Sequence, residues 1–118
     1  MSSALEYIQS KFPDADFSGR MPVTIPISRH GGLTRMFRDL GFRTGAEIGV
    51  EQGRFSEEIC KDNPGVHLYC IDSWMAYSRY KDHVIQSKLD RFFKEAVARL
   101  ESYFVTVIRK QSMDAVRD

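Results

Sequence analysis

The residues best suited to bind a ligand gather in one short segment near the middle of the chain, residues 45–56. Gly49 and Gly53 stand there between an apolar stretch and a helix-like stretch, and Glu47 and Glu51 add two carboxylates. Glycines in a strand-to-helix turn let a ligand approach the backbone, as in nucleotide-binding crevices at the carboxyl ends of parallel strands. The spacing is G-x-x-x-G rather than G-x-G-x-x-G, and the carboxylates would repel a phosphate. We therefore expect a ligand that carries positive charge.

Acidic residues also follow two later apolar segments. Asp72 comes directly after the apolar residues 66–71, close to the offset of roughly 20 residues at which a βαβ unit places the acid that holds a ribose. A third apolar segment, residues 104–108, is followed by Ser112-Met113-Asp114. Because the carboxyl ends of parallel strands meet at one edge of a sheet, we expect the three segments to lie together.

In this order the three segments resemble the class I S-adenosylmethionine-dependent methyltransferases. The matching features are E-x-G-x-x-x-G after an apolar strand, a second strand that ends in Asp72, and a third strand that ends near Ser112-Met113-Asp114. The resemblance extends from about residue 41 to the C-terminus. It implies a Rossmann-like parallel sheet and an enzyme that transfers a methyl group. Its cofactor, S-adenosylmethionine, carries a sulfonium and an ammonium beside one carboxylate, which suits acidic residues in the turn.

The resemblance assigns the methionine and ribose ends of the cofactor to four residues. Glu47, Gly49 and Gly53 would frame the methionine end, with Glu47 acting through its backbone and on the ammonium. Asp72 would accept hydrogen bonds from the ribose hydroxyls. The residues also have structural interpretations, since Glu47 and Glu51 can be solvated turn acids and Asp72 can cap a following helix.

The adenine end is assigned to four further residues. Ser73 or Trp74 would lie along the ring, Met113 would offer a backbone amide, and Asp114 would accept from the exocyclic amine. A large aromatic residue just after a strand can equally fill the core, which is the alternative for Trp74. Ser112 or Asp114 can equally cap a helix.

The periodicity of the chain predicts an α/β fold with alternating strands and helices. Residues 45–50 and 66–71 have the apolar character of buried strands, and residues 104–108 are rich in β-branched residues. The alternation β-α-β-α-β predicts a parallel sheet. We expect one partial domain over residues 1–118, with an N-terminal helical extension and loop at 1–40 and a cofactor-binding half at 41–118. The expected helices lie at about 3–12, 28–40, 53–61 and 81–103.

Length and composition bound the class of protein. The chain has 118 residues, 42% of them hydrophobic, which is enough for one core, and its formal net charge of +1 gives no broad field for nucleic acid. No apolar run approaches the ~20 residues that span a bilayer, so a cytoplasmic location without membrane contact is expected. Cys60 and Cys70 are expected to be reduced and to pack as small apolar groups.

The chain is short for the family that it resembles, whose domain has about seven strands and on the order of 200 residues. We expect the N-terminal half of a methyltransferase, truncated or partial, with the edge of the strand at 45–50 open. An open apolar edge invites pairing with another chain, so a homo-oligomer through this edge is an alternative.

Basic and aromatic residues outside the motifs have weaker interpretations. His30, His67 and His83 have no metal-ligand spacing, so no metal site is expected. Five basic residues, Arg29, His30, Arg35, Arg38 and Arg43, can contact an acidic substrate or form a solvated helix face. The polar aromatic segment 77–83 is a candidate flap over the cofactor.

Three other functions remain open from the sequence. These are a nucleotide-sugar or NAD-dependent enzyme, a noncatalytic interaction module, and a nonfunctional remnant. No catalytic base and no methyl acceptor can be identified in this stretch of sequence.

Overall fold

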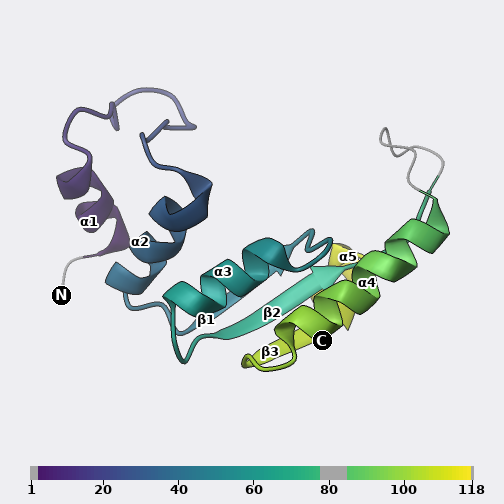
Figure 1. The fold of residues 1–118 in the computed structure, drawn as a ribbon. Coiled ribbons are helices and arrows are strands. Elements are labelled where there is room, and N and C mark those ends of the chain that lie inside the picture. The colour runs from purple at the N-terminus through teal and green to yellow at the C-terminus, as the bar shows by residue number, and fades with distance from the viewer. Residues whose placement is uncertain (1–2, 78–84, 118) are drawn as a thin grey trace.

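The computed structural model describes residues 3–77 and 85–117 (Figure 1). An N-terminal segment with short helices is followed by alternating strands and helices. The sheet and the two longer helices lie side by side, and the N-terminal segment projects from one end of them (Figure 1). The elements are α1 (Ala4–Lys11), η1 (Arg29–Leu33), α2 (Thr34–Asp39), β1 (Thr44–Ile48), α3 (Arg54–Asp62), β2 (His67–Asp72), α4 (Gln86–Leu100), β3 (Val105–Arg109) and α5 (Ser112–Ala115).

The three strands form one parallel sheet in the order β1-β2-β3. Ala46 lies opposite Tyr69, and Tyr69 lies opposite Thr106. The carboxyl ends of all three strands therefore meet at one edge of the sheet. The prediction of a mixed α/β fold with three parallel strands is confirmed, and the arrangement is compatible with part of a Rossmann-like fold.

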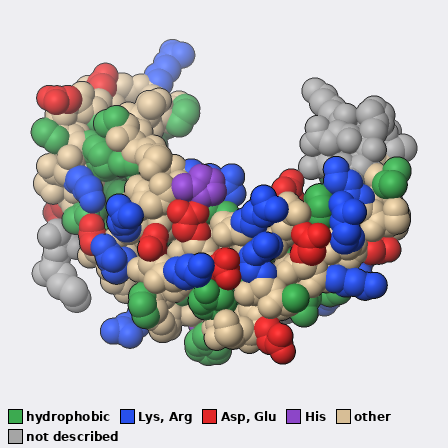
Figure 2. All heavy atoms as spheres, viewed as in Figure 1, with side chains coloured by type: hydrophobic (Ala, Val, Ile, Leu, Met, Phe, Trp, Pro, Cys, Tyr) green, Lys and Arg blue, Asp and Glu red, His purple; other side chains and the backbone are tan. Residues whose placement is uncertain are grey.

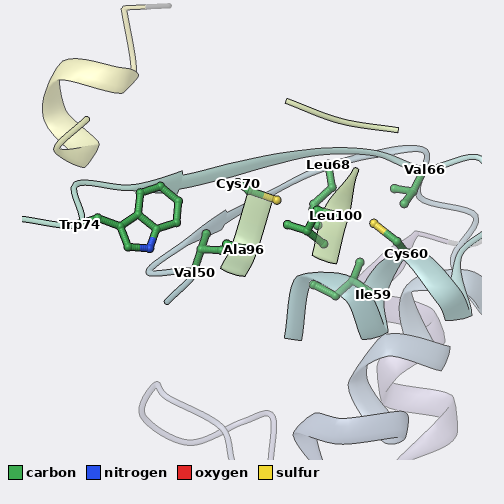
Figure 3. Packing of buried hydrophobic residues seen from close by; sticks show 9 residues of the cluster. All are labelled: Val50, Ile59, Cys60, Val66, Leu68, Cys70, Trp74, Ala96 and Leu100. Atoms are coloured by element: carbon green, nitrogen blue, oxygen red, sulfur yellow. The ribbon is translucent and has the colours of Figure 1, made fainter. Parts of the chain in front are cut away.

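Helices α3 and α4 cover one face of this sheet and enclose the core (Figures 1 and 3). Residues from β2, such as Leu68 and Cys70, point toward Leu100 of α4, and Ile59 approaches from α3 (Figure 3). Cys60 and Cys70 are buried free thiols, as expected from the sequence. The buried apolar residues of the core are Val50, Ile59, Cys60, Val66, Leu68, Cys70, Trp74, Ala96 and Leu100.

The opposite face of the sheet is largely open among the described residues. The short helix α5 lies over part of it, against β2 (Figure 3). Ile48 of β1 is 69% exposed, and Phe104, which precedes β3, is 63% exposed. His67 lies between Tyr69 and Phe104, stacks on Phe104 with ring centroids 4.0 Å apart, and contacts the Thr106 hydroxyl at 2.8 Å. It is thus a satisfied histidine of the sheet.

The N-terminal segment differs from the prediction at one point. Helix α1 begins at the expected capping box, in which Ser3 and Glu6 bond reciprocally. A continuous helix over residues 28–40 was the wrong prediction, because His30 and Gly31 have non-helical backbone angles and Gly31 has φ +82°. The segment is attached to α3 by two hydrogen bonds of Thr34, whose hydroxyl donates to Asp62 at 2.5 Å and whose carbonyl accepts from Asn63 at 2.9 Å.

Charge on the surface is mixed. Figure 2 shows Lys and Arg side chains interspersed with Asp and Glu over the face that α3 and α4 form. No helix within residues 3–77 and 85–117 is long and apolar enough to cross a membrane.

Candidate functional site

A cavity of about 570 Å³ lies at the carboxyl ends of the three strands. The ends of β1 and β2 form its floor, the residues after β3 form a second wall, and α4 closes it with two apolar side chains. A crevice in this position is where ligands bind in parallel α/β sheets. Its lining residues are Ile48, Gly49, Glu51, Ile71, Asp72, Ser73, Trp74, Met75, Tyr77, Leu89, Phe92, Lys110, Gln111 and Ser112.

The two glycines of the turn have different roles. Both have left-handed backbone angles, φ +89° at Gly49 and φ +78° at Gly53. A Cβ on Gly49 would meet nothing within 4 Å, and Gly49 lies on the cavity wall, so a ligand can approach its backbone. A Cβ on Gly53 would lie 3.2 Å from Cα of Ala96 and 3.3 Å from Leu100. Gly53 is buried between α3 and α4 and does not line the cavity, so its role here is helix packing rather than ligand contact.

Asp72 braces the turn as well as lining the cavity. Its Oδ2 accepts from the backbone amides of Val50 at 2.9 Å and Glu51 at 3.0 Å, and its Oδ1 accepts from the amide of Trp74 at 2.9 Å. Hydrogen bonds from several backbone amides to one carboxylate are strong and directional. Oδ2 is filled by two amides, whereas Oδ1 accepts from one amide and keeps a lone pair, so Asp72 can also accept from a ligand hydroxyl at Oδ1 while it fixes the β1–α3 turn.

Glu47 lies beneath the turn rather than on the cavity wall. Its side chain is on the covered face of β1, where Oε1 accepts from the Ser56 hydroxyl at 2.6 Å. Glu47 is only 9% exposed, and its Oε2 has no hydrogen-bond partner among the described residues. Burial raises the pKa of the Glu47 carboxyl, and only the Ser56 bond and Arg29 oppose that shift. The geometry thus places Glu47 behind the predicted methionine end and directs its side chain into the protein.

Trp74 belongs to the core. It is 1% exposed, it packs edge-on against Phe93 with ring centroids 5.0 Å apart, and its indole N–H donates to the carbonyl of Glu51 at 2.8 Å. A buried, hydrogen-bonded indole offers no open platform to an adenine ring. The alternative in which Trp74 fills the core therefore describes this structure, although Trp74 also borders the cavity beside Ser73.

The wall after β3 comes from residues slightly earlier than predicted. Met113 is 76% exposed, and neither Met113 nor Asp114 lines the cavity. The amide of Asp114 instead donates to the carbonyl of Gln111 at 3.0 Å, in the first turn of α5. Lys110, Gln111 and Ser112 form this wall. The predicted adenine-binding residues Met113 and Asp114 therefore lie off the cavity wall, which the segment 110–112 forms instead.

Sequence reasoning assigned no ligand role to Leu89 and Phe92, whereas Glu51 and Tyr77, which also line the cavity, were candidate contacts. Leu89 and Phe92 were recognised as one apolar face of a helix, but nothing in their spacing separates a cavity wall from a core contact. Glu51 lines the cavity with φ +54°, a conformation that non-glycine residues rarely adopt. Tyr77 of the predicted flap lines the cavity, whereas residues 78–83 lie outside the described part.

A smaller cavity of about 280 Å³ adjoins the other side of the turn. It shares Gly49 and Glu51 with the larger cavity, and η1 and the start of α3 form its remaining walls. Among residues 3–77 and 85–117, no group of His, Cys, Asp and Glu is arranged to hold a metal ion.

Comparison with known proteins gives this chain no family. No family model, no curated protein and no solved structure matches it.

Proposed function

We propose that this chain binds S-adenosylmethionine in the larger cavity and serves as the cofactor-binding part of a methyltransferase. The observation that carries the proposal is the position and charge of this cavity. It opens at the carboxyl ends of parallel strands, and its lining holds two carboxylates, Glu51 and Asp72, beside Gly49, against one cationic side chain, Lys110. A sulfonium and an ammonium are favoured there, and a diphosphate is not.

The walls of the cavity suit the other parts of this cofactor. Its volume is within the range of small-molecule sites, about 300–1,000 Å³. Phe92 and Leu89 offer apolar surface to a purine ring, while Ser73 and Gln111 offer hydrogen bonds to hydroxyl or amine groups. Asp72, which already holds the turn, can accept from a ribose hydroxyl.

Methyl transfer requires little covalent chemistry from the protein. The methyl group moves from a reactive sulfonium to a nucleophile in line with the breaking bond, so positioning supplies much of the rate. In this chain, Gly49 allows close approach of the donor to the turn, and Glu51 supplies negative charge next to it.

Calorimetric titration with S-adenosylmethionine, S-adenosylhomocysteine and NAD tests the proposal. The first two ligands share the ammonium, and only the first carries the sulfonium. We expect both to bind and NAD to bind weakly or not at all. Binding of NAD in preference to both would refute the proposal.

Two glutamine variants sharpen this experiment. Glu51→Gln removes one exposed charge at the cavity. The attraction between two opposite charges ~4 Å apart in water is about 1 kcal/mol, so the ligand affinity should fall about fivefold. Loss for both ligands would place Glu51 near the ammonium, and loss for S-adenosylmethionine alone would place it near the sulfonium. Glu101→Gln is the matched control, since Glu101 is exposed and does not line this cavity. Equal effects of the two variants would contradict the electrostatic argument.

A noncatalytic interaction module is the second candidate, and one observation favours it. β1 pairs with β2 alone, so its other edge has no partner strand among the described residues, and Ile48 is exposed beside it. Open strand edges pair readily with other chains. Size-exclusion chromatography with light scattering would show a concentration-dependent dimer that Ala46→Lys abolishes. A monomer at all concentrations would remove self-association as a function.

A further inference from the structure

The smaller cavity gathers cationic side chains on the far side of the glycine turn. Three of its residues, Arg29, His30 and Arg54, are basic, and Glu51 is the acid among them. The cavity lies between η1 and the start of α3, so it is formed by the N-terminal segment together with the sheet domain. The full set of lining residues is Arg29, His30, Gly49, Val50, Glu51, Gln52, Arg54 and Phe55.

The two arginines of this cavity are in no close ion pair within the described part of the chain, although the charge of Arg29 opposes the rise in the pKa of Glu47. Arg29 places its guanidinium over the ring of Phe55, with Cζ 4.1 Å from the centroid, a cation–π contact that favours this position of the side chain. Neither Arg29 nor Arg54 forms an ion pair with a described carboxylate within 4 Å. An arginine held by stacking keeps its N–H groups for planar anions such as carboxylate and phosphate.

His30 is held in a defined orientation by a carboxylate. Its Nδ1 lies 2.5 Å from Oε2 of Glu58, and its ring packs edge-on against Phe55 with centroids 5.6 Å apart. The break in the helix at His30 and Gly31 places this ring against α3, and the Ser28 hydroxyl donates to the His30 carbonyl at 2.8 Å. With Nδ1 bonded to a carboxylate, Nε2 is the nitrogen that can meet a ligand.

The cavity also adjoins the proposed donor site. Gly49 and Glu51 belong to the walls of both cavities, so the two cavities adjoin the same turn. The first turn of α3, which begins at Arg54, adds backbone amides and the positive end of a helix dipole. A group bound in the smaller cavity would therefore sit next to the methionine end of the cofactor.

We propose that the smaller cavity is the acceptor subsite and that it binds a carboxylate or phosphate group of the methyl acceptor. Arg29 and Arg54 hold the anion, and His30, oriented by Glu58, contacts the acceptor at Nε2. The role as acceptor subsite rests on the proposed methyltransferase function, while binding of the anion does not. The acceptor class is thus a molecule with an anionic group rather than an apolar compound.

Nuclear magnetic resonance titration of the whole chain with inorganic phosphate, and separately with acetate, tests the anion site. The His30 ring resonance is identified by its loss in His30→Asn. We expect a saturable shift of this resonance. The anion that binds with the higher affinity indicates whether the acceptor carries phosphate or carboxylate. Arg54→Gln should weaken the binding about tenfold or more, since it removes charge-assisted hydrogen bonds.

Arg35→Gln is the matched control for this titration. Arg35 is exposed, lies in the same segment and does not line the cavity, so its loss should leave the affinity unchanged. Equal weakening by both variants, or a shift that does not saturate, would overturn the anion site. S-Adenosylhomocysteine is titrated in parallel. Its failure to bind while phosphate still binds would overturn the donor site and the acceptor role, whereas the reverse result would overturn the anion site alone.

Discussion

Replacement of Gly53 by alanine should destabilise the fold through two separate physical effects. Gly53 has φ +78°, and an L-residue in the left-handed region costs roughly 1–2 kcal/mol. The new Cβ would also lie 3.2 Å from Cα of Ala96, a backbone atom that cannot rotate away, and overpacking of this kind costs about 1–3 kcal/mol. We expect Gly53→Ala to lower the free energy of unfolding by roughly 2–5 kcal/mol.

Two glycine controls separate the two effects. Gly41 and Gly49 have φ +70° and +89°, and a Cβ at either would meet nothing within 4 Å. Gly41→Ala and Gly49→Ala should therefore show only the backbone term of roughly 1–2 kcal/mol. Urea unfolding followed by circular dichroism gives all three values, and the difference between Gly53→Ala and the controls measures packing between α3 and α4.

The same series connects stability with the proposed site. Gly49 lines both cavities, so Gly49→Ala should also weaken ligand binding, while Gly41→Ala should not. If Gly53→Ala were no more destabilising than Gly41→Ala, the close approach of Gly53 to α4 would not contribute to the free energy of unfolding. The overpacking argument would then be refuted.

Three further predictions concern the turn and the core. Asp72→Asn should destabilise the fold by about 1–3 kcal/mol, because the asparagine side chain has one acceptor oxygen where the carboxylate has two. Hydrogen exchange of the backbone amides in the turn should accelerate, and unchanged exchange would contradict this. Burial raises the pKa of Glu47, so the fold binds more protons than the unfolded chain between the ordinary and the raised pKa, and stability falls as pH rises through that window. Glu47→Gln should lack this fall, and parallel pH profiles of urea midpoints for the two proteins would refute the assignment. Burial raises the pKa of Cys60 and Cys70 to about 11, so an aromatic disulfide reagent should modify both only after unfolding; rapid labelling of the folded chain would show that a thiol is accessible.

The sequence predicted the sheet well because strands buried on a face leave a strong local pattern. Apolar residues marked all three strands to within one or two residues of the observed bounds, and β-branched side chains further marked the third. The parallel order followed from the alternation of strands with helices. The break at Gly31 was missed because an apolar stripe across residues 33–40 does not report the backbone angles of the residues before it.

The site was predicted in position and only partly in its residues. The edge of the sheet where the cavity lies follows from topology, which is why Gly49, Asp72 and Ser73 lie on its wall. Side-chain direction depends on tertiary packing, which sequence spacing does not reveal. Trp74 is in the core, and Glu47 faces α3, because the same strand end that opens to the cavity also closes the core beneath it.

The residues of the smaller cavity could likewise not be assigned to a binding site from sequence spacing alone. Its basic residues were noticed in the sequence, but a solvated face and a binding site have the same spacing on a helix. Arg29 contacts Phe55 and His30 contacts Glu58, and both partners belong to α3. Only these tertiary contacts distinguish a binding site from a solvated face.

The bracing of the turn by Asp72 has a consequence for the thermodynamics of recognition. Since three backbone amides already bond to this carboxylate, an incoming molecule meets a receptor surface that is preorganised. Less conformational entropy is then lost on complex formation, and more of the contact energy remains as affinity. Ligand binding should accordingly require little rearrangement of the β1–α3 turn, unlike binding to a loop that becomes ordered only around its ligand.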